Sequence, residues 1–277
     1  MTKAAFLITS GLIITALLFY FNMNKKTVEA EEVRILETWE LPKILEEISG
    51  IAYIGDNLMA CVQDEEGTIF IYDLKKKIIV REIEFAGGGD FESITVGGST
   101  AYILRSDGAI YEVGNILSAN PVIKTLYTPE KSGGNFEGLE YDEKNKRLLV
   151  SIKEGSGKEL RPLYFFDLQT AQMVEAPVYN ISFNDPAFSM LGKKPSEKFL
   201  RPSEISIHPK TGKIYILEGM NPKILILNAD GIPENIHLLS RKQFRQPEGL
   251  TFGKNGEIYI SNEGNGTPPN ILQISLN

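Results

Sequence analysis

Short apolar segments separated by turn residues recur from about residue 35 to the C-terminus. Residues 58–62, 69–74 and 78–85 are typical: each is a short, mainly apolar run, the last two are rich in β-branched and aromatic side chains, and turn residues such as Gly, Asp or Lys lie between them. Segments of this length and composition, bounded by turn residues, are typical of β-strands. The pattern therefore predicts an all-β protein built from many short strands.

Five of these segments share a similar opening sequence. They are Ile48-Ser49-Gly50-Ile51, Phe91-Glu92-Ser93-Ile94, Phe136-Glu137-Gly138-Leu139, Pro202-Ser203-Glu204-Ile205 and Pro247-Glu248-Gly249-Leu250, the fourth being one residue out of step. Each opening is followed by a second and a third apolar run. The openings are 43, 45, 67 and 44 residues apart, counted from Ser49, Glu92, Glu137, Glu204 and Glu248.

A period near 44 residues with four short strands is typical of one blade of a β-propeller. The interval of 67 residues is too short for two blades, so we interpret it as one blade whose last strand is 172–181, plus an insertion near 184–200. Five blades are predicted, with six as the alternative if the insertion contains a degenerate blade. The fifth blade lacks an outer strand, which residues 32–41 are expected to supply, closing the ring.

The first 30 residues have a different character. Residues 4–21 are mainly apolar, with Lys3 before them and Lys25 and Lys26 after them, as in a signal anchor or a signal peptide. Val28-Glu29-Ala30 offers a cleavage site, so anchoring and cleavage both stay open. We expect an N-terminal membrane segment in 1–30 and a propeller domain in 31–277, held at the cell membrane on its extracytoplasmic side, or secreted or periplasmic if cleaved near Ala30.

Composition and charge narrow the chemistry. Twenty-nine Lys and Arg against 36 Asp and Glu give a net charge of −7, which is unfavourable for binding nucleic acid. Two histidines and one cysteine are too few for a His/Cys zinc site or a disulfide framework. Any site must therefore use carboxylates, amides, hydroxyls, Lys or Arg.

Acidic residues recur at the openings, where the innermost strands of a propeller line its central channel. The four are Glu92, Glu137, Glu204 and Glu248. Carboxylates that converge on one axis repel one another and raise each other's pKa values unless a cation offsets them. Hard oxygen ligands favour Ca²⁺ or Mg²⁺, so a divalent metal on the axis is one hypothesis. Hydrogen bonds to backbone amides of neighbouring blades are the alternative.

A second set of polar residues follows the second strand of each repeat, where the loops of a propeller surround the mouth of the channel. The candidates for the channel mouth are Gln63, Asp64, Arg105, Glu154, Glu218, Asn262 and Glu263. Any junction between a strand and a turn is polar, so an ordinary turn is the competing interpretation.

The segments FESI, NFEGLEYD, QPEGLTF, RPSEISIHPKTGKIYIL at 201–217 and IYISNEGN at 258–265 resemble the SdiA-regulated (YjiK-like) β-propeller family over about residues 35–277. NHL-repeat, gluconolactonase-like and strictosidine-synthase-like propellers share the Pro-Glu-Gly-Leu opening. The resemblance implies a propeller in the bacterial cell envelope. Calcium-dependent lactonases of this kind hold the metal with a Glu at the opening, matched here by Glu248 or Glu137, and with an amide matched by Asn262. This chain lacks their catalytic Asp at a comparable opening.

Two functions are therefore predicted. The first is a monomeric, membrane-tethered propeller that binds a small molecule or protein at its channel face, together with Ca²⁺, and catalyses no reaction. The alternative is a Ca²⁺-dependent hydrolase of lactones, esters or phosphoesters, including a phytase-like enzyme, in which a channel carboxylate activates water. We favour the binding function because a fold alone confers no activity and no general base stands out.

Overall fold

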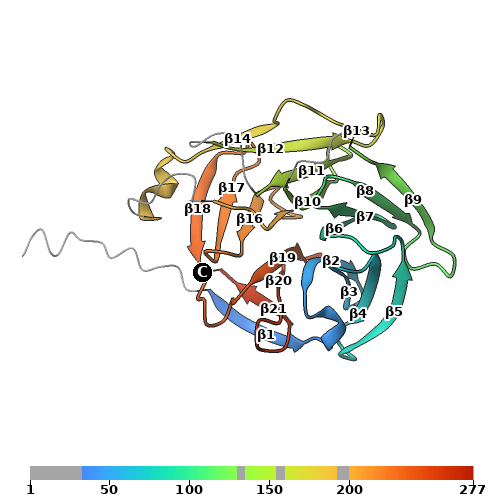
Figure 1. Cartoon of the computed structure of the whole chain (residues 1–277). Coiled ribbons are helices and arrows are strands. Elements are labelled where there is room, and N and C mark those ends of the chain that lie inside the picture. Colours follow the sequence, from blue (N-terminus) through green and yellow to red (C-terminus); the bar gives the residue numbers. More distant parts are fainter. Residues whose placement is uncertain (1–32, 130–134, 154–159, 192–199, 277) are drawn as a thin grey trace, which may run out of the picture. The chain divides into compact units, whose positions relative to one another are not determined.

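Five antiparallel β-sheets form a ring in the computed structural model, which describes residues 33–129, 135–153, 160–191 and 200–276 (Figure 1). The first sheet comprises β2 (Ile48–Gly55), β3 (Leu58–Gln63), β4 (Thr68–Asp73) and β5 (Ile78–Glu84). The second comprises β6 (Phe91–Gly97), β7 (Thr100–Arg105), β8 (Ile110–Gly114) and β9 (Val122–Tyr127). The third comprises β10 (Phe136–Asp142), β11 (Arg147–Ile152), β12 (Leu160–Asp167), β13 (Gln172–Met173) and β14 (Tyr179–Ser182). The fourth comprises β15 (Glu204–Ile207), β16 (Ile214–Glu218), β17 (Lys223–Leu227) and β18 (Pro233–Leu238), and the fifth β19 (Pro247–Phe252), β20 (Ile258–Asn262), β21 (Asn270–Ser275) and β1 (Arg34–Glu40).

The innermost strands make the ring continuous. β2 contacts β6, β6 contacts β10, β10 contacts β15, β15 contacts β19, and β19 returns to β2. This cycle is a five-bladed β-propeller, so the predicted fold and blade number are confirmed and the alternative of six blades is wrong.

The predicted closure of the ring by the N-terminal strand is also confirmed. β1 pairs antiparallel with β21, with Arg34 opposite Ser275 and Glu40 opposite Asn270. Trp39 then joins the fifth blade to the first: its indole N–H donates a 2.8 Å hydrogen bond to the carbonyl of Leu74, and its ring is buried. The closure removes the open edges between the first and last blades.

Apolar side chains fill the five spaces between neighbouring blades. One cluster, for example, joins Val62 of the first blade to Phe91 of the second, and another joins Leu217 of the fourth to Leu250 of the fifth. Burial of each such side chain stabilises the fold by about 1.5–3 kcal/mol. The repeated Ile or Leu of each opening points into these spaces, as the sequence pattern predicts.

The third blade differs from the others in its outer edge. The predicted strand 172–181 is divided into β13 and β14, and both pair with β12. The predicted insertion begins with the 3₁₀ helix η2 (Pro186–Leu191), and residues 192–199 lie outside the described part. A second 3₁₀ helix, η1 (Lys43–Leu45), leads from β1 to β2.

The predicted membrane or signal segment, residues 1–30, also lies outside the described residues. Among the residues that are described, no helix is long and apolar enough to cross a membrane.

Candidate functional site

Three of the four predicted axial carboxylates come together where the innermost strands begin. Glu92, Glu137 and Glu248 open β6, β10 and β19, and their charges interact with one another and with Lys153. We call this end of the channel the acidic mouth; it comprises these three glutamates and, as described below, Asp64 and Glu263. These side chains meet because the 44-residue repeat brings equivalent positions of different blades to one axis.

Burial and mutual repulsion make these groups hard to ionise. Burial, then the charges of Glu137 and Asp90, raises the pKa of Glu92 to about 9. Burial raises the pKa of Glu137 to about 7, against the opposing effect of Lys153. Burial also raises the pKa of Glu248, which the hydroxyl of Ser203 and the charge of Lys153 partly offset. Carboxyl groups that share a poorly solvated space behave in this way when too few cations are present.

Lys153 is the cation that contacts the axial carboxylates most directly. Its Nζ lies 3.0 Å from Oε1 of Glu137 and donates a 3.1 Å hydrogen bond to Oε2. Oε1 itself is buried and accepts no hydrogen bond from the described residues. One ammonium group therefore faces several acids.

Two of the residues predicted at the channel mouth extend this cluster. Burial, followed by the charges of Glu248, Asp64 and Glu47, raises the pKa of Glu263 to about 8. Burial, then the charge of Glu47, raises the pKa of Asp64 to about 6. One oxygen of Asp64, Oδ1, is buried without a hydrogen-bond partner among the described residues. No group of three or more acidic, His or Cys side chains in the described part of the chain has the geometry to hold a metal ion.

The fourth axial carboxylate, Glu204, does not join the acidic mouth. Its strand is shifted by one residue, so Ser203 occupies the position of the other glutamates, and Glu204 occupies the position held elsewhere by glycine or by Ser93. The side chain is buried: Oε2 accepts a 2.7 Å hydrogen bond from the Ser93 hydroxyl, and Oε1 accepts 3.1 and 2.9 Å bonds from the amides of Leu139 and Ile205. Glu204 thus follows the alternative predicted for these carboxylates and binds backbone amides of a neighbouring blade.

The remaining mouth candidates have local structural contacts. Gln63 is buried and its Oε1 accepts hydrogen bonds from the amides of Glu65 and Glu66, which stabilises the turn after β3. Arg105 forms an ion pair with Asp107 at 2.7 Å in the next turn. Asn262 is buried and its Nδ2 donates a hydrogen bond to Asn270. Glu154 lies outside the described residues.

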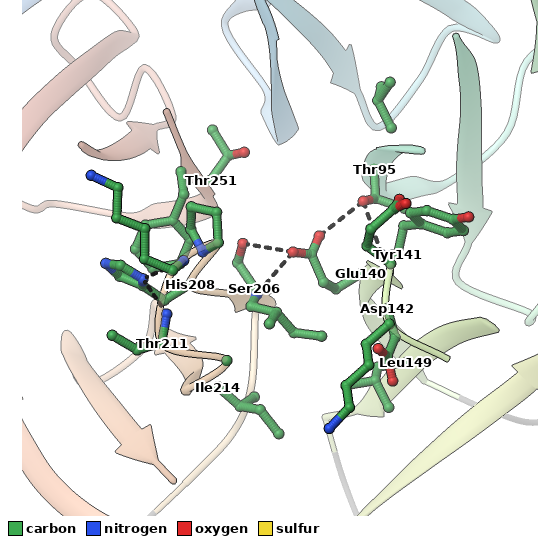
Figure 2. A pocket seen from close by; sticks show the side chains of 18 of the residues that line it. Thr95, Glu140, Tyr141, Asp142, Leu149, Ser206, His208, Thr211, Ile214 and Thr251 are labelled. Atoms are coloured by element: carbon green, nitrogen blue, oxygen red, sulfur yellow. Dashed lines mark hydrogen bonds between the residues drawn. The ribbon is translucent and has the colours of Figure 1, made fainter. Parts of the chain in front are cut away.

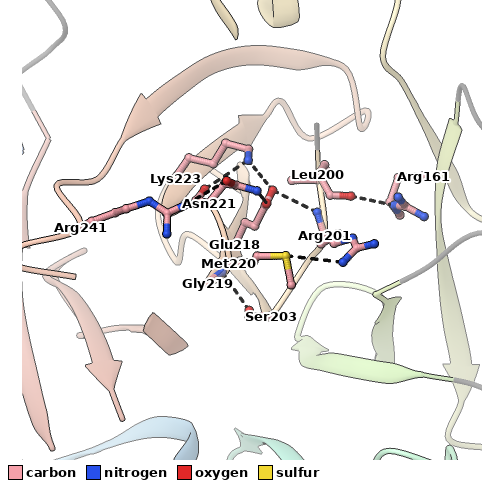
Figure 3. Close-up of polar contacts among 10 residues, drawn as sticks. All are labelled: Arg161, Leu200, Arg201, Ser203, Glu218, Gly219, Met220, Asn221, Lys223 and Arg241. Atoms are coloured by element: carbon pink, nitrogen blue, oxygen red, sulfur yellow. Dashed lines mark hydrogen bonds and ion pairs between the residues drawn. The ribbon is translucent and has the colours of Figure 1, made fainter. Parts of the chain in front are cut away.

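Glu218 was predicted at the mouth and is instead fully buried at the end of β16 (Figure 3). It forms an ion pair with Lys223, and its carboxylate also accepts hydrogen bonds from the backbone amide of Arg201 at 3.1 Å and the side-chain amide of Asn221 at 3.2 Å. Every one of these donors comes from the fourth blade or from the segment just before it, so Glu218 stabilises this region from within.

Sequence reasoning missed a cavity of about 890 Å³ at the opposite end of the channel (Figure 2). Its lining includes a polar residue three positions beyond the opening in four of the blades: Thr95, Glu140, Ser206 and Thr251. These residues repeat with the same period as the openings, and that repetition is the signal that would have revealed them. Figure 2 shows Glu140 between Thr95 and Ser206, with hydrogen bonds to both.

The titration of the acidic mouth leads to a testable prediction. In the folded chain Glu92, Glu263 and Glu137 have pKa values of about 9, 8 and 7, all above the ordinary value of 4.5. Between pH 4.5 and 9 the folded state then holds more protons than the unfolded state, so the free energy of unfolding falls as the pH rises. We expect urea unfolding at pH 5, 7 and 9 to give progressively lower stability.

Glu92→Gln tests the origin of this slope, because it removes the group with the highest of these pKa values. The variant is expected to lose less stability than the wild type between pH 7 and 9. Glu84→Gln, on the exposed outer strand β5, is the matched control and should follow the wild type. Parallel pH profiles for Glu92→Gln and the wild type would contradict the assignment.

Comparisons with known proteins agree with this architecture. A family model described as SdiA-regulated matches residues 24–267. Glutaminyl cyclase from Myxococcus xanthus has a similar structure, with 15% sequence identity and a TM-score of 0.64 over 88% of this chain and 96% of that one. The PQQ-bound aldose sugar dehydrogenase from Streptomyces coelicolor is similar over 89% of this chain and 98% of its own, with 11% identity and a TM-score of 0.53. No match was found among curated protein sequences. Identities this low indicate a shared fold alone.

Proposed function

The chain belongs to the SdiA-regulated family, and we propose that its propeller binds a divalent cation, Ca²⁺, at the acidic mouth and uses that face to bind a ligand or protein partner. The observation that carries the proposal is the set of carboxyl groups with raised pKa values around a single lysine. Such a cluster is destabilised by its own charge, and a bound cation relieves this repulsion.

The donor atoms of the mouth suit a hard cation. Ca²⁺ takes about 6–8 oxygen ligands and accepts carboxylates and carbonyls in flexible arrangements. Oδ1 of Asp64 is a buried oxygen that accepts no hydrogen bond from the described residues, and Oε1 of Glu137 is contacted by the Lys153 ammonium group, which a cation would replace. Glu92, Glu248 and Glu263 would supply further oxygens after their side chains turn towards the cation, since no three of the described acidic groups are already arranged to hold one. Soft or nitrogen-preferring metals find no such match, because the mouth candidates include neither His nor Cys.

In the absence of a cation, Lys153 provides the compensating charge. Its ammonium group lies against Glu137, and its charge also lowers the pKa values of Glu92 and Glu248. Lys153 is about one-third exposed, so the side chain has room to turn towards solvent when a cation binds. Cation binding would then release protons from Glu92 and Glu263, which makes the affinity increase with pH.

The location of the domain follows from the N-terminal segment. The apolar run 4–21 is a signal anchor or signal peptide, and the propeller is placed on the extracytoplasmic side of the membrane in either case. Calcium is abundant outside the cytoplasm, and extracellular modules bind it with Kd values of about 10⁻⁴–10⁻³ M. A mouth of several carboxylates with one competing lysine fits affinity in that range.

Thermal unfolding of the full chain in a neutral detergent tests the proposal. Excess Ca²⁺ at pH 7.5 is expected to raise the Tm, because a ligand at about 100 times its Kd stabilises the folded state by about 2.7 kcal/mol. The Ca²⁺-induced shift should be lost in Glu137→Gln and in Glu248→Gln. In the wild type, a chelator should return the Tm to its value without Ca²⁺.

The control is Glu84→Gln, which removes the same charge on the outer strand β5 and should keep the full Ca²⁺-induced shift. A shift of equal size in all four proteins would mean that Ca²⁺ binds elsewhere, and the acidic mouth would lose its proposed role.

One observation favours the hydrolase as a second candidate. Glu92 and Glu137 interact, and their pKa values of about 9 and 7 differ enough for one carboxyl group to be protonated while its neighbour is largely ionised at pH 8. Such a pair can serve as acid and base. Assays of the full chain with Ca²⁺ against lactones, esters and phosphoesters, including phytate, decide the matter: absence of turnover in a protein that shows the Ca²⁺-induced shift rules out hydrolysis of these classes.

A further inference from the structure

The cavity opposite the acidic mouth has a polar floor built from three blades. Glu140 of β10 lies at this floor: its Oε2 accepts a 2.8 Å hydrogen bond from the hydroxyl of Thr95, and its Oε1 accepts a 3.1 Å bond from the hydroxyl of Ser206 and a 2.8 Å bond from the amide of Ile207 (Figure 2). These donors are neutral and come from β6 and β15. The carboxylate is thus held in place by neutral donors, and Oε2, which accepts one of these hydrogen bonds, keeps capacity for a further donor.

Hydroxyl and aromatic groups surround Glu140. Thr251 lines the cavity, and its Oγ1 accepts the backbone N–H of Tyr53 at 3.3 Å, which leaves its hydroxyl hydrogen available as a donor. The walls include the rings of Tyr53, Tyr141 and Phe252. Burial raises the pKa of Glu140 to about 7 against the effect of its hydrogen bonds, so near neutral pH a hydroxyl-bearing ligand that donates to Oε2 would favour its ionised form.

Lysines from three consecutive blades stand at the rim of this cavity. Lys144, Lys210 and Lys254 lie in the turns after β10, β15 and β19, and all three are exposed. None of them forms an ion pair with a residue that the structure describes. Neighbouring cations are paired instead: Lys213 lies 2.6 Å from Glu234, and Arg147 lies 2.9 Å from Asp142. The rim therefore presents three exposed lysines that form no ion pair among the described residues, at one end of a channel whose other end is acidic.

The chain also enters the propeller at this end. β19 runs from the acidic mouth to Phe252 at the cavity, and Phe252 is paired with Ile258. Ile258 is paired with Ile274, and the adjoining residue Ser275 is opposite Arg34 at the start of β1. β1 therefore begins at the end of the propeller that carries the lysine rim.

We propose that this cavity binds a phosphorylated polyol, with the phosphate on Lys144, Lys210 and Lys254 and the hydroxyl groups on Glu140 and Thr251. The rim supplies the positive charge that an anion requires, and the floor supplies a hydrogen-bond acceptor for ligand hydroxyl groups. Inorganic phosphate has no polyol hydroxyl groups and would not use this acceptor. Lysine binds phosphate as a mobile point charge, so three exposed lysines suit a group that varies in its orientation. The same chemistry occurs in a phosphoglycerol lipid headgroup and in a soluble polyol phosphate.

Calorimetric titration of the full chain in neutral detergent with glycerol 1-phosphate is the primary test, and glycerol and inorganic phosphate are the comparison ligands. We expect glycerol 1-phosphate to bind at least tenfold more tightly than either. The triple variant Lys144→Gln/Lys210→Gln/Lys254→Gln should weaken binding at least tenfold. Equal affinity for glycerol 1-phosphate and inorganic phosphate, or no binding at all, overturns the proposal.

The control for charge is Lys75→Gln/Lys77→Gln/Lys242→Gln, which removes three exposed lysines that do not line the cavity. It should bind as the wild type does; an equal loss in both triple variants would mean that overall charge attracts the ligand. Glu140→Gln should lose the preference for glycerol 1-phosphate over inorganic phosphate, and Thr251→Val should reduce it if Glu140→Gln does not fold. A preference unchanged in the variants that fold contradicts the assigned floor.

Flotation with vesicles distinguishes the two sources of the ligand. If vesicles that contain phosphatidylglycerol compete with glycerol 1-phosphate more strongly than vesicles of pure phosphatidylcholine do, the ligand is a lipid headgroup. If only soluble polyol phosphates compete, the ligand is soluble. Both results support the cavity. Glu137→Gln should retain this binding, because the acidic mouth lies at the other end of the channel, so failure of the Ca²⁺ site and failure of this site give different results.

Discussion

Replacing Lys223 by methionine is expected to lower the free energy of unfolding by about 3–5 kcal/mol. Lys223 is 3% exposed and its partner Glu218 is fully buried, so neither charge is well solvated (Figure 3). Removal of the ammonium group leaves the Glu218 carboxylate buried without its counterion. The hydrogen bonds that it accepts from Arg201 and Asn221 are too few to replace hydration.

Urea unfolding measures this loss of stability, and two further variants test whether it comes from the buried, unpaired charge. Glu218→Gln/Lys223→Met removes both charges and keeps an acceptor for the amides, so it should recover at least about 1 kcal/mol of the loss. Lys213→Met breaks the exposed pair with Glu234 in the same blade and should cost less than about 1 kcal/mol. Equal losses for Lys213→Met and Lys223→Met would show that burial of the ion pair is unimportant.

Glu204→Ala is expected to destabilise the protein by about 2–4 kcal/mol, the second large effect. Alanine removes the acceptor of the buried amides of Leu139 and Ile205 and the partner of the Ser93 hydroxyl. These groups lie at the axis, where the strands approach too closely for water to take their place: a Cβ at Gly138 would lie 2.8 Å from the amide nitrogen of Ile205.

Glu204→Gln separates hydrogen bonding from charge. Burial raises the pKa of Glu204 well above its ordinary value, which favours the neutral carboxyl group, and glutamine has nearly the same shape without a charge. The expected loss for Glu204→Gln is less than about 1 kcal/mol, measured by urea unfolding at pH 7 beside Glu204→Ala. A glutamine variant as unstable as the alanine variant would mean that the group is ionised and that its charge is needed.

The position of Glu204 also bears on function, because its side chain lies between the two ends of the channel. Its side chain crosses from the fourth blade to the second and third between the layer of Glu92, Glu137 and Glu248 and the layer of Glu140. The acidic mouth and the lysine-rimmed cavity are therefore distinct sites.

Much of the fold could be predicted because a propeller repeats in sequence as it repeats in space. The 44-residue period of the openings predicts the blades, and the missing outer strand of the fifth blade predicts that the N-terminal strand closes the ring, as β1 does. The glutamates at the openings of β6, β10 and β19 were likewise predicted to meet, since equivalent positions of a closed ring lie around one axis. The family resemblance, confirmed by the match over residues 24–267, rests on the same repeated segments.

The pattern of residues by itself determined the architecture and placed acidic residues at one channel mouth. Only the tertiary structure decided which carboxylates share that mouth. A shift of one residue turns a side chain to the opposite face of its strand, which separates Glu204 from the other glutamates. Glu218 is instead buried within the fourth blade, where it forms an ion pair with Lys223. The lysine-rimmed cavity was equally hidden, because Lys144, Lys210 and Lys254 lie in turns that look ordinary in sequence and become neighbours only when the ring closes.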